Sequence, residues 1–185
     1  MRCLQGKLLC ASLLCLIAGS VSYSLASEYR DSESGVSLSL PPGWRWIGPE
    51  RWGDHESTLL LREPGTGQEI KLYVKNLEPP EAVMPARKMN KRLLKQAQRK
   101  ADQRTGEGFE NYRNRVDSFE LKPINGRSAM HWVADYTKNG RKMVEYLTRV
   151  RSENTSALFF ARLPAEQLDD FKGRIDPIIE TLQVP

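Results

Sequence analysis

The sequence predicts an α+β fold in which an antiparallel β-sheet is flanked by helices. Runs of alternating or β-rich residues fall into two groups along the chain, and a run with helical spacing follows each group. This segregation of strands and helices favours an antiparallel sheet over a parallel one. Asn139-Gly140 joins two of the β-rich runs, and this dipeptide is typical of the tight turn between antiparallel strands.

The first 26 residues have the layout of a secretory signal peptide. Two basic residues, Arg2 and Lys7, precede an apolar stretch from Leu8 to Ala18, and small residues at Ser24 and Ala26 form a cleavage site. The apolar stretch is much shorter than the roughly 20 residues needed to cross a bilayer, which disfavours an uncleaved anchor. We therefore expect cleavage near Ala26 and an exported protein, either periplasmic or secreted.

The three cysteines, Cys3, Cys10 and Cys15, all lie in the segment that cleavage would remove. A lipid anchor on Cys15 is disfavoured because the bulky Leu14 stands where lipoprotein signals have a small residue. The remaining chain of about 160 residues has no cysteine and must be stabilised by a hydrophobic core, for which this length suffices. We expect a flexible lead-in over residues 27–34 and a single domain over residues 35–185.

Three strands are expected in the first group. Apolar residues alternate with serines from Val36 to Leu40, and Pro41-Pro42-Gly43 ends this strand. Residues 57–62 and 69–75 form the other two strands, and the turn between them contains one proline and two glycines. The first group therefore supplies a strand and a hairpin to the sheet.

The second group predicts a four-stranded meander followed by a helix. The central hairpin pairs residues 129–136 with residues 143–150, and further strands are expected over residues 115–121 and 157–163. Both faces of the hairpin are apolar and need cover. The C-terminal helix covers one face, is expected to kink at Pro177, and has these apolar residues at helical spacing: Leu168, Phe171, Ile175, Ile178, Ile179 and Leu182.

The stretch Gly35-Val36-Ser37-Leu38-Ser39-Leu40-Pro41-Pro42-Gly43-Trp44 resembles the opening strand and Pro-x-Gly-Trp turn of PsbP-like domains, which include bacterial exported DcrB-like proteins. The order of the later strands and helices is similar to that family across about residues 35–183. The resemblance implies a PsbP-like α/β/α sandwich that serves as a non-catalytic accessory, assembly or binding module outside the cytoplasm. It implies no catalytic residues.

The sequence contains few of the residue patterns that catalytic sites use. The chain after residue 26 has no cysteine, two histidines and no Gly-x-Ser-x-Gly motif, so we expect no enzyme. A hydrolase site assembled only by folding is the alternative. Asp54-His55-Glu56 suits a solvated turn better than a metal site, and His131 fits a half-buried strand position. No loop has the pattern of a phosphate-binding site, and we expect no cofactor or metal.

A helix over residues 86–104 carries most of the basic character of the chain. This stretch lacks glycine and proline and repeats apolar residues at helical spacing. It contains one acid, Asp102, and eight basic residues: Arg87, Lys88, Lys91, Arg92, Lys95, Arg99, Lys100 and Arg104. Its net charge is +7. After removal of Arg2 and Lys7, 26 basic and 23 acidic residues remain, a net charge of +3, so the rest of the chain carries −4.

The basic helix predicts contact with an anionic component of the cell envelope. An acidic protein surface, a polymer or a peripherally contacted lipid surface would each bind there with an affinity that falls as salt rises. A helix whose charges serve only solubility is the alternative. Nucleic acid is not expected, because the chain is exported and no aromatic residues interleave with the charges. We expect a monomer.

Three tryptophans, Trp44, Trp46 and Trp52, lie close together in the sequence. Trp44 follows the Pro-Gly turn and is expected in the core. Trp46 and Trp52 suggest an alternative function, in which the protein carries an apolar or glycolipid ligand in a groove near these two side chains.

Overall fold

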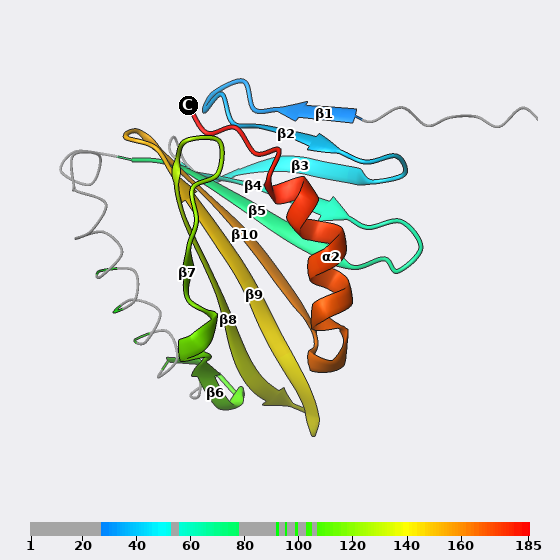
Figure 1. Cartoon of the computed structure of the whole chain (residues 1–185). Coiled ribbons are helices and arrows are strands. Elements are labelled where there is room, and N and C mark those ends of the chain that lie inside the picture. Colours follow the sequence, from blue (N-terminus) through cyan, green and yellow to red (C-terminus); the bar gives the residue numbers. More distant parts are fainter. Residues whose placement is uncertain are drawn as a thin grey trace, which may run out of the picture.

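The computed structural model describes residues 27–52, 56–77, 92, 95, 99, 103, 104 and 107–185. These residues form an eight-stranded antiparallel sheet, a separate two-stranded sheet and the helix α2 (Leu168–Ile179), which lies along one side of the large sheet (Figure 1). The predicted α+β class is confirmed. In the described part of the chain, no helix has the length and apolar character that a membrane crossing requires.

The large sheet combines strands from both halves of the sequence. Its order is β3-β4-β5-β10-β9-β8-β6, and β7 also pairs with β8. The pairing of β10 with β5 joins the two halves. The bounds are β3 (Arg45–Trp52), β4 (Glu56–Arg62), β5 (Glu69–Asn76), β6 (Glu110–Asn114), β7 (Glu120–Leu121), β8 (Ser128–Lys138), β9 (Arg141–Arg151) and β10 (Thr155–Pro164).

The central hairpin has the register that its turn predicts. Lys138 pairs with Arg141 across a two-residue turn, in which Asn139 and Gly140 have φ values of 51° and 73°. Positive φ at both central positions is the requirement of a type I′ turn, and Asn-Gly meets it at low cost. The register of the hairpin assigns alternate residues of β8 and β9 to opposite faces, as the sequence indicates.

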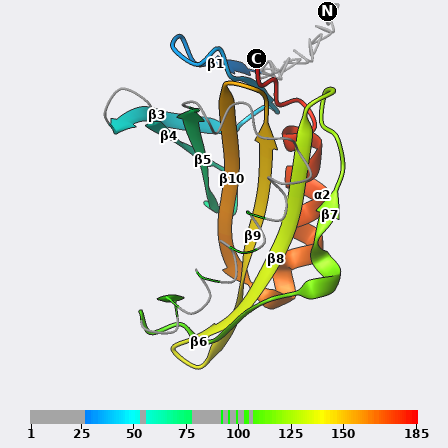
Figure 2. The ribbon, with the colours of Figure 1, turned by 90° about the vertical axis from the view of Figure 1, so that its left-hand side faces the viewer.

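One face of the sheet forms the main hydrophobic core with α2. Val144 of β9 and Phe159 of β10 lie on this face and are buried together with Phe171 and Ile175 of α2. Figure 2 shows α2 on one side of strands β8, β9 and β10. The helix is not divided at Pro177 and ends two residues later. Only the end of the last turn follows the proline, so little of the helix can be disturbed by it.

The opposite face carries a second, smaller apolar cluster. Met130 and Trp132 of β8 and Leu147 of β9 are buried there, and Leu158 and Phe160 of β10 pack against them. The sequence therefore correctly indicates two apolar faces. The predicted helix over residues 86–104 is described only at residues 92, 95, 99, 103 and 104, which have helical backbone; its other residues lie outside the described residues.

Residues 27–34 form folded structure and correct the expectation of a flexible lead-in. β1 (Ser27–Arg30) pairs with β2 (Ser37–Leu40), and the Tyr29 side chain is buried. Asp31 is also buried and accepts hydrogen bonds from Arg51 and Ser34. A polar stretch with one inward-facing aromatic residue has too little periodicity to be detected in the sequence. The C-terminal residues run beside β2 (Figure 1).

The predicted strand over residues 115–121 is interrupted. The chain forms β6, then a single turn of 3₁₀-helix at Val116–Ser118, then the short β7. The Ser118 hydroxyl accepts a 2.9 Å hydrogen bond from the backbone N–H of Val133. This side-chain acceptor replaces a backbone partner, so the chain can leave the sheet for one turn without leaving the Val133 donor unsatisfied.

If β1 belongs to the core, removing the Tyr29 side chain will destabilise the whole fold. We expect Tyr29→Ala to lower the free energy of unfolding by about 3 kcal/mol, because the ring is 5% exposed and packs edge-on against Trp46. The neighbouring Glu28→Ala is the control, since Glu28 is exposed, and should change it by less than about 0.5 kcal/mol. Urea unfolding measures both, and equal small effects would contradict the assignment.

Candidate functional site

A cleft with a volume of about 560 Å³ lies over the sheet face opposite α2. Its floor comes from neighbouring strands, and its apolar members are Trp132, Leu147, Leu158 and Phe160. Pairing in the sheet aligns three of them in one row, because Trp132 is opposite Leu147 and Leu147 is opposite Phe160. Lys71 of β5 lies opposite Phe160 and continues the row as its charged end. We call this site the cationic cleft.

The charges around the cationic cleft are strongly unbalanced. The cationic side chains that line it are Lys71, Arg99, Arg104, Arg149 and Arg162. Among the described residues that line the cleft, Glu145 is the one acid. In this described set, five cations against one carboxylate leave an excess of four positive charges, which favours anionic ligands.

Glu145 holds several of these groups in place. Its side chain is 3% exposed and accepts a 2.9 Å hydrogen bond from Nε of Arg162, while Arg104 lies at 3.8 Å. The Tyr112 hydroxyl donates a 2.7 Å hydrogen bond to the other carboxylate oxygen. Burial, followed by the Glu145 charge, raises the pKa of the Tyr112 hydroxyl, which therefore remains a hydrogen-bond donor at neutral pH.

Aromatic rings fix the two arginines further. The guanidinium carbon of Arg162 lies 5.0 Å from the ring centroids of Phe109 and Phe160, and that of Arg104 lies 5.1 Å from the Phe109 centroid. Arg162 uses Nε for Glu145, and a guanidinium has five N–H donors in all. The arrangement holds two cations beside Glu145, on one flank of the apolar row.

The described residues of the predicted partner-binding helix lie partly at this cleft. Arg92, Lys95 and Arg99 are exposed, and Arg99 lines the cationic cleft. Arg104 is half-buried and pairs with Glu107 at 3.0 Å as well as approaching Glu145. Four of the predicted residues lie outside the described residues: Arg87, Lys88, Lys91 and Lys100.

The structure does not place the predicted tryptophan groove at the cleft. Trp46 lies on the edge strand β3, is 38% exposed and packs against Tyr29. The side chain of Trp52 lies outside the described residues. Trp132 instead contributes to the cleft floor, and the sequence signal that identifies it is its position on the second apolar face of the central hairpin. The groove near Trp46 and Trp52 stays a prediction.

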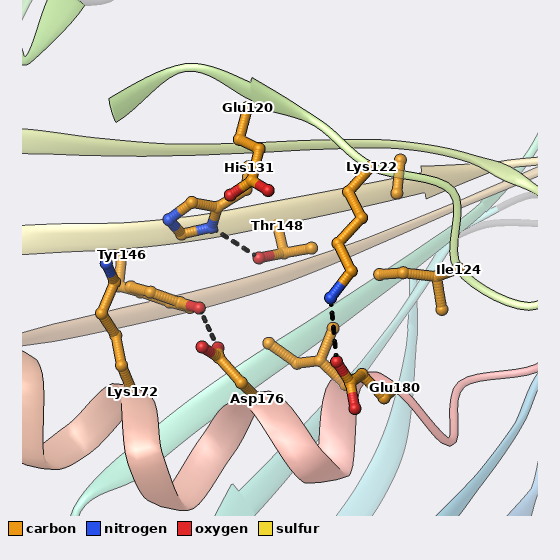
Figure 3. Close-up of a pocket in the computed structure, with 11 residues that line it drawn as sticks. Glu120, Lys122, Ile124, His131, Tyr146, Thr148, Lys172, Asp176 and Glu180 are labelled. Atoms are coloured by element: carbon orange, nitrogen blue, oxygen red, sulfur yellow. Dashed lines mark hydrogen bonds and ion pairs between the residues drawn. The ribbon is translucent and has the colours of Figure 1, made fainter. Parts of the chain in front are cut away.

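A second, smaller cavity of about 120 Å³ lies between α2 and strands β7, β8 and β9 (Figure 3). Thr148 Oγ1 lies 3.0 Å from Nδ1 of His131, and the Tyr146 hydroxyl donates a hydrogen bond to Asp176. Lys122 and Glu180 form an ion pair at 3.0 Å near the edge of the cavity. Burial, with a smaller contribution from Lys172, lowers the pKa of His131, so the ring is neutral at pH 7.

This histidine has a structural arrangement rather than that of a hydrolase. Thr148 is buried, and Asp176 binds the Tyr146 hydroxyl rather than the His131 ring. An activated nucleophile needs an accessible hydroxyl and a base that a third group orients. Among the described residues, no three histidine, cysteine, aspartate or glutamate side chains come together as a metal site would require; His55 lies outside them.

No protein-family model matches the sequence, and no curated protein matches it at the sequence level. Solved structures do match. The cyanobacterial PsbP (CyanoP) from Synechocystis sp. PCC 6803 superposes with a TM-score of 0.62 at 12% identity, over 90% of this chain and 96% of that one. The chain adopts a PsbP-like fold. The resemblance predicted from residues 35–44 is therefore confirmed for the fold.

Two further structures share the PsbP-like fold. LpqN of Mycobacterium tuberculosis, described as involved in cell envelope biogenesis, has a TM-score of 0.53 at 14% identity, over 86% of this chain and 92% of that one. A protein from Bacteroides thetaiotaomicron has a TM-score of 0.52 at 13% identity, over 85% of this chain and 48% of that one. This chain thus spans about half of the Bacteroides protein. At these identities the likeness concerns the PsbP-like fold alone.

The Glu145–Arg162 pair gives a prediction for the PsbP-like core. Arg162→Met leaves Glu145 buried with fewer donors and should lower the free energy of unfolding by about 2 kcal/mol. Arg141→Met is the control, because Arg141 forms an equally short ion pair with Glu166, but both side chains are exposed; it should cost less than about 0.5 kcal/mol. Urea unfolding at pH 7 compares the two, and equal losses would show that burial of Glu145 does not matter.

The neutral state of His131 predicts a pH dependence of stability. A pKa below the ordinary value of 6.5 means that the unfolded chain binds a proton more readily than the folded one. The contribution of His131 to the free energy of unfolding is therefore fully present above the pKa of the histidine in the unfolded chain, and it declines as pH falls below about 6.5. In His131→Asn this part of the decline should disappear, whereas the rest of the pH dependence should remain. Urea midpoints measured at about pH 7.5 and about pH 5 test this, and identical declines in both proteins would refute it.

Proposed function

We propose that this protein is an exported, non-catalytic accessory protein of the cell envelope that binds an anionic partner through its basic segment, residues 87–104. The observation that carries the proposal is the exposure of Arg92, Lys95 and Arg99. These residues are spaced three and four apart on helical backbone and therefore share one face of the helix. A partner can thus meet several positive charges at once.

The distribution of charge supports the same function. The basic segment carries +7, and the remainder of the chain after Ala26 carries −4. Such an asymmetry orients the protein toward an anionic surface and keeps its other faces away from it. The charged face borders the cationic cleft at Arg99.

Export and the absence of catalysis are part of the proposal. The first 26 residues read as a signal peptide, and β1 begins at Ser27, directly after the expected cleavage site. His131, the histidine that the structure describes, has no accessible nucleophile beside it. CyanoP and LpqN share the fold, and LpqN is described as involved in envelope biogenesis, which agrees with a role in the envelope.

Charge reversal tests the contact surface. Vesicles that contain phosphatidylglycerol should sediment with the protein at about 0.05 M salt and release it at about 0.5 M salt. We expect Arg92→Glu/Lys95→Glu to weaken this binding about tenfold or more, because each cation near an anionic surface contributes about 1 kcal/mol. Co-purification with envelope fractions at the same two salt concentrations extends the test to protein and polymer partners.

The matched control is Arg113→Glu/Lys142→Glu, which makes the same change in net charge at two exposed positions outside the basic segment. This variant should retain most of the binding. Equal losses in both double variants would mean that net charge alone matters. Binding that is insensitive to salt, or no binding to vesicles and envelope fractions at low salt, would overturn the proposal.

A further inference from the structure

We propose that the cationic cleft is a binding site for a single-chain amphipathic anion, a molecule with one carboxylate or phosphate head and one alkyl chain. The alkyl chain would lie along the apolar row from Phe160 to Trp132, and the head would bind Lys71 and Arg162. This site is separate from the exposed helix face of the proposed function, although Arg99 borders both.

The floor of the cationic cleft is built on one apolar row, with Leu158 beside it on β10. Trp132, Leu147 and Phe160 lie side by side on β8, β9 and β10, so the row crosses neighbouring strands at about 4.8 Å per strand. Charged residues bound it on β9, where Glu145 and Arg149 stand two residues to either side of Leu147 and on the same face of the sheet. On β9 the apolar surface is thus one residue wide, a width that suits one alkyl chain rather than a bulky ring system.

The volume of the cleft agrees with a ligand of this size. About 560 Å³ lies within the range of roughly 300–1,000 Å³ that is typical of small-molecule sites. Such sites combine apolar walls with a few polar groups that fix the orientation of the ligand. The apolar members here are Leu158 and the row itself, and the polar groups are the cations at its edge.

The positive charge of the residues that line the cleft favours an anionic ligand. Glu145, the acid among the lining residues, already accepts hydrogen bonds from Arg162 and Tyr112 through its two oxygens. It carries one negative charge among five lining cations, and Glu107 offsets part of the charge of Arg104. An anionic head group is attracted by the positive charge that remains. Arginine presents planar, paired donors that match carboxylate and phosphate oxygens, and Arg162 is held in position by Glu145 and two aromatic rings.

The head group is placed at the Lys71 end by the sheet register. Lys71 is exposed and lies directly opposite Phe160, and Arg162 is two residues from Phe160 on the same face of β10. Trp132, at the other end of the row, stacks against Phe119 with ring centroids 6.4 Å apart. One end of the row is thus cationic and the other is aromatic, which gives an amphipathic ligand a single orientation.

Dodecanoate and dodecyl phosphate are the probes, measured by calorimetric titration of the protein purified from cells that express the full chain. Dodecanol, which has the chain without the charge, and acetate, which has the charge without the chain, should each bind about tenfold or more weakly than dodecanoate. The two anionic probes distinguish a carboxylate head from a phosphate head. Comparable binding of dodecanol, or no saturable binding of either anion, would overturn the proposal.

Two lysines of β5 provide a matched pair of variants. Lys71→Glu should weaken dodecanoate binding about tenfold or more, whereas Lys75→Glu should leave it unchanged. Lys75 lies on the same strand and the same face of the sheet. Its side chain is 50% exposed, and it is not among the residues that line the cleft. Both substitutions are at the surface and should fold normally. Equal effects of the two variants would refute the assignment of the head-group site.

The apolar row is tested by Phe160→Ala, which should reduce the affinity for dodecanoate but not the small affinity for acetate. The charge-reversed helix variant Arg92→Glu/Lys95→Glu should bind dodecanoate as the unmodified protein does. Amphiphile binding without vesicle binding would therefore overturn only the proposed function. Vesicle binding without amphiphile binding would overturn only the cleft proposal.

Discussion

The pairing of β10 with β5 and β9 is the interaction on which the rest of the structure depends. It makes one sheet from two groups of strands that are far apart in the sequence, with Phe159 opposite Leu72 and Phe160 opposite Leu147. Successive residues of β10 point to opposite faces, so Phe159 enters the core beneath α2 and Phe160 enters the cleft. A single strand thereby determines both the stable core and the candidate binding surface.

The side chains on the two faces of this sheet are buried in different ways. α2 covers one face with an apolar stripe, and the buried Tyr146 there donates a hydrogen bond to Asp176 of the helix. The other face combines a short apolar row with a buried carboxylate, and burying a charge is costly unless donors surround it. Glu145 therefore requires Arg162 and Tyr112 nearby. The cationic character of the cleft follows in part from this requirement.

Local patterns in the sequence predict those parts of the fold that local interactions determine. The Asn139-Gly140 turn sets the register of the central hairpin, and α2 follows from apolar spacing over Leu168 to Ile179. Two predictions failed where tertiary contacts decide. Residues 27–30 form a strand that pairs with β2, and Arg51 binds the adjacent Asp31. Residues 116–118 leave the sheet because Ser118 accepts a hydrogen bond from Val133. Local patterns do not identify Arg51 or Val133 as these partners.

The sequence by itself determined the α+β class, the two apolar faces of the central hairpin and the concentration of positive charge in residues 87–104. Only the tertiary structure decided that Trp132 rather than Trp46 lines a cleft, and that Lys71, Phe160 and Leu147 stand in one row with it. The physical reason is that the row is perpendicular to the strands. Its members are joined by hydrogen bonding between strands that are distant in the sequence, and no periodicity along one strand encodes which strand lies beside it.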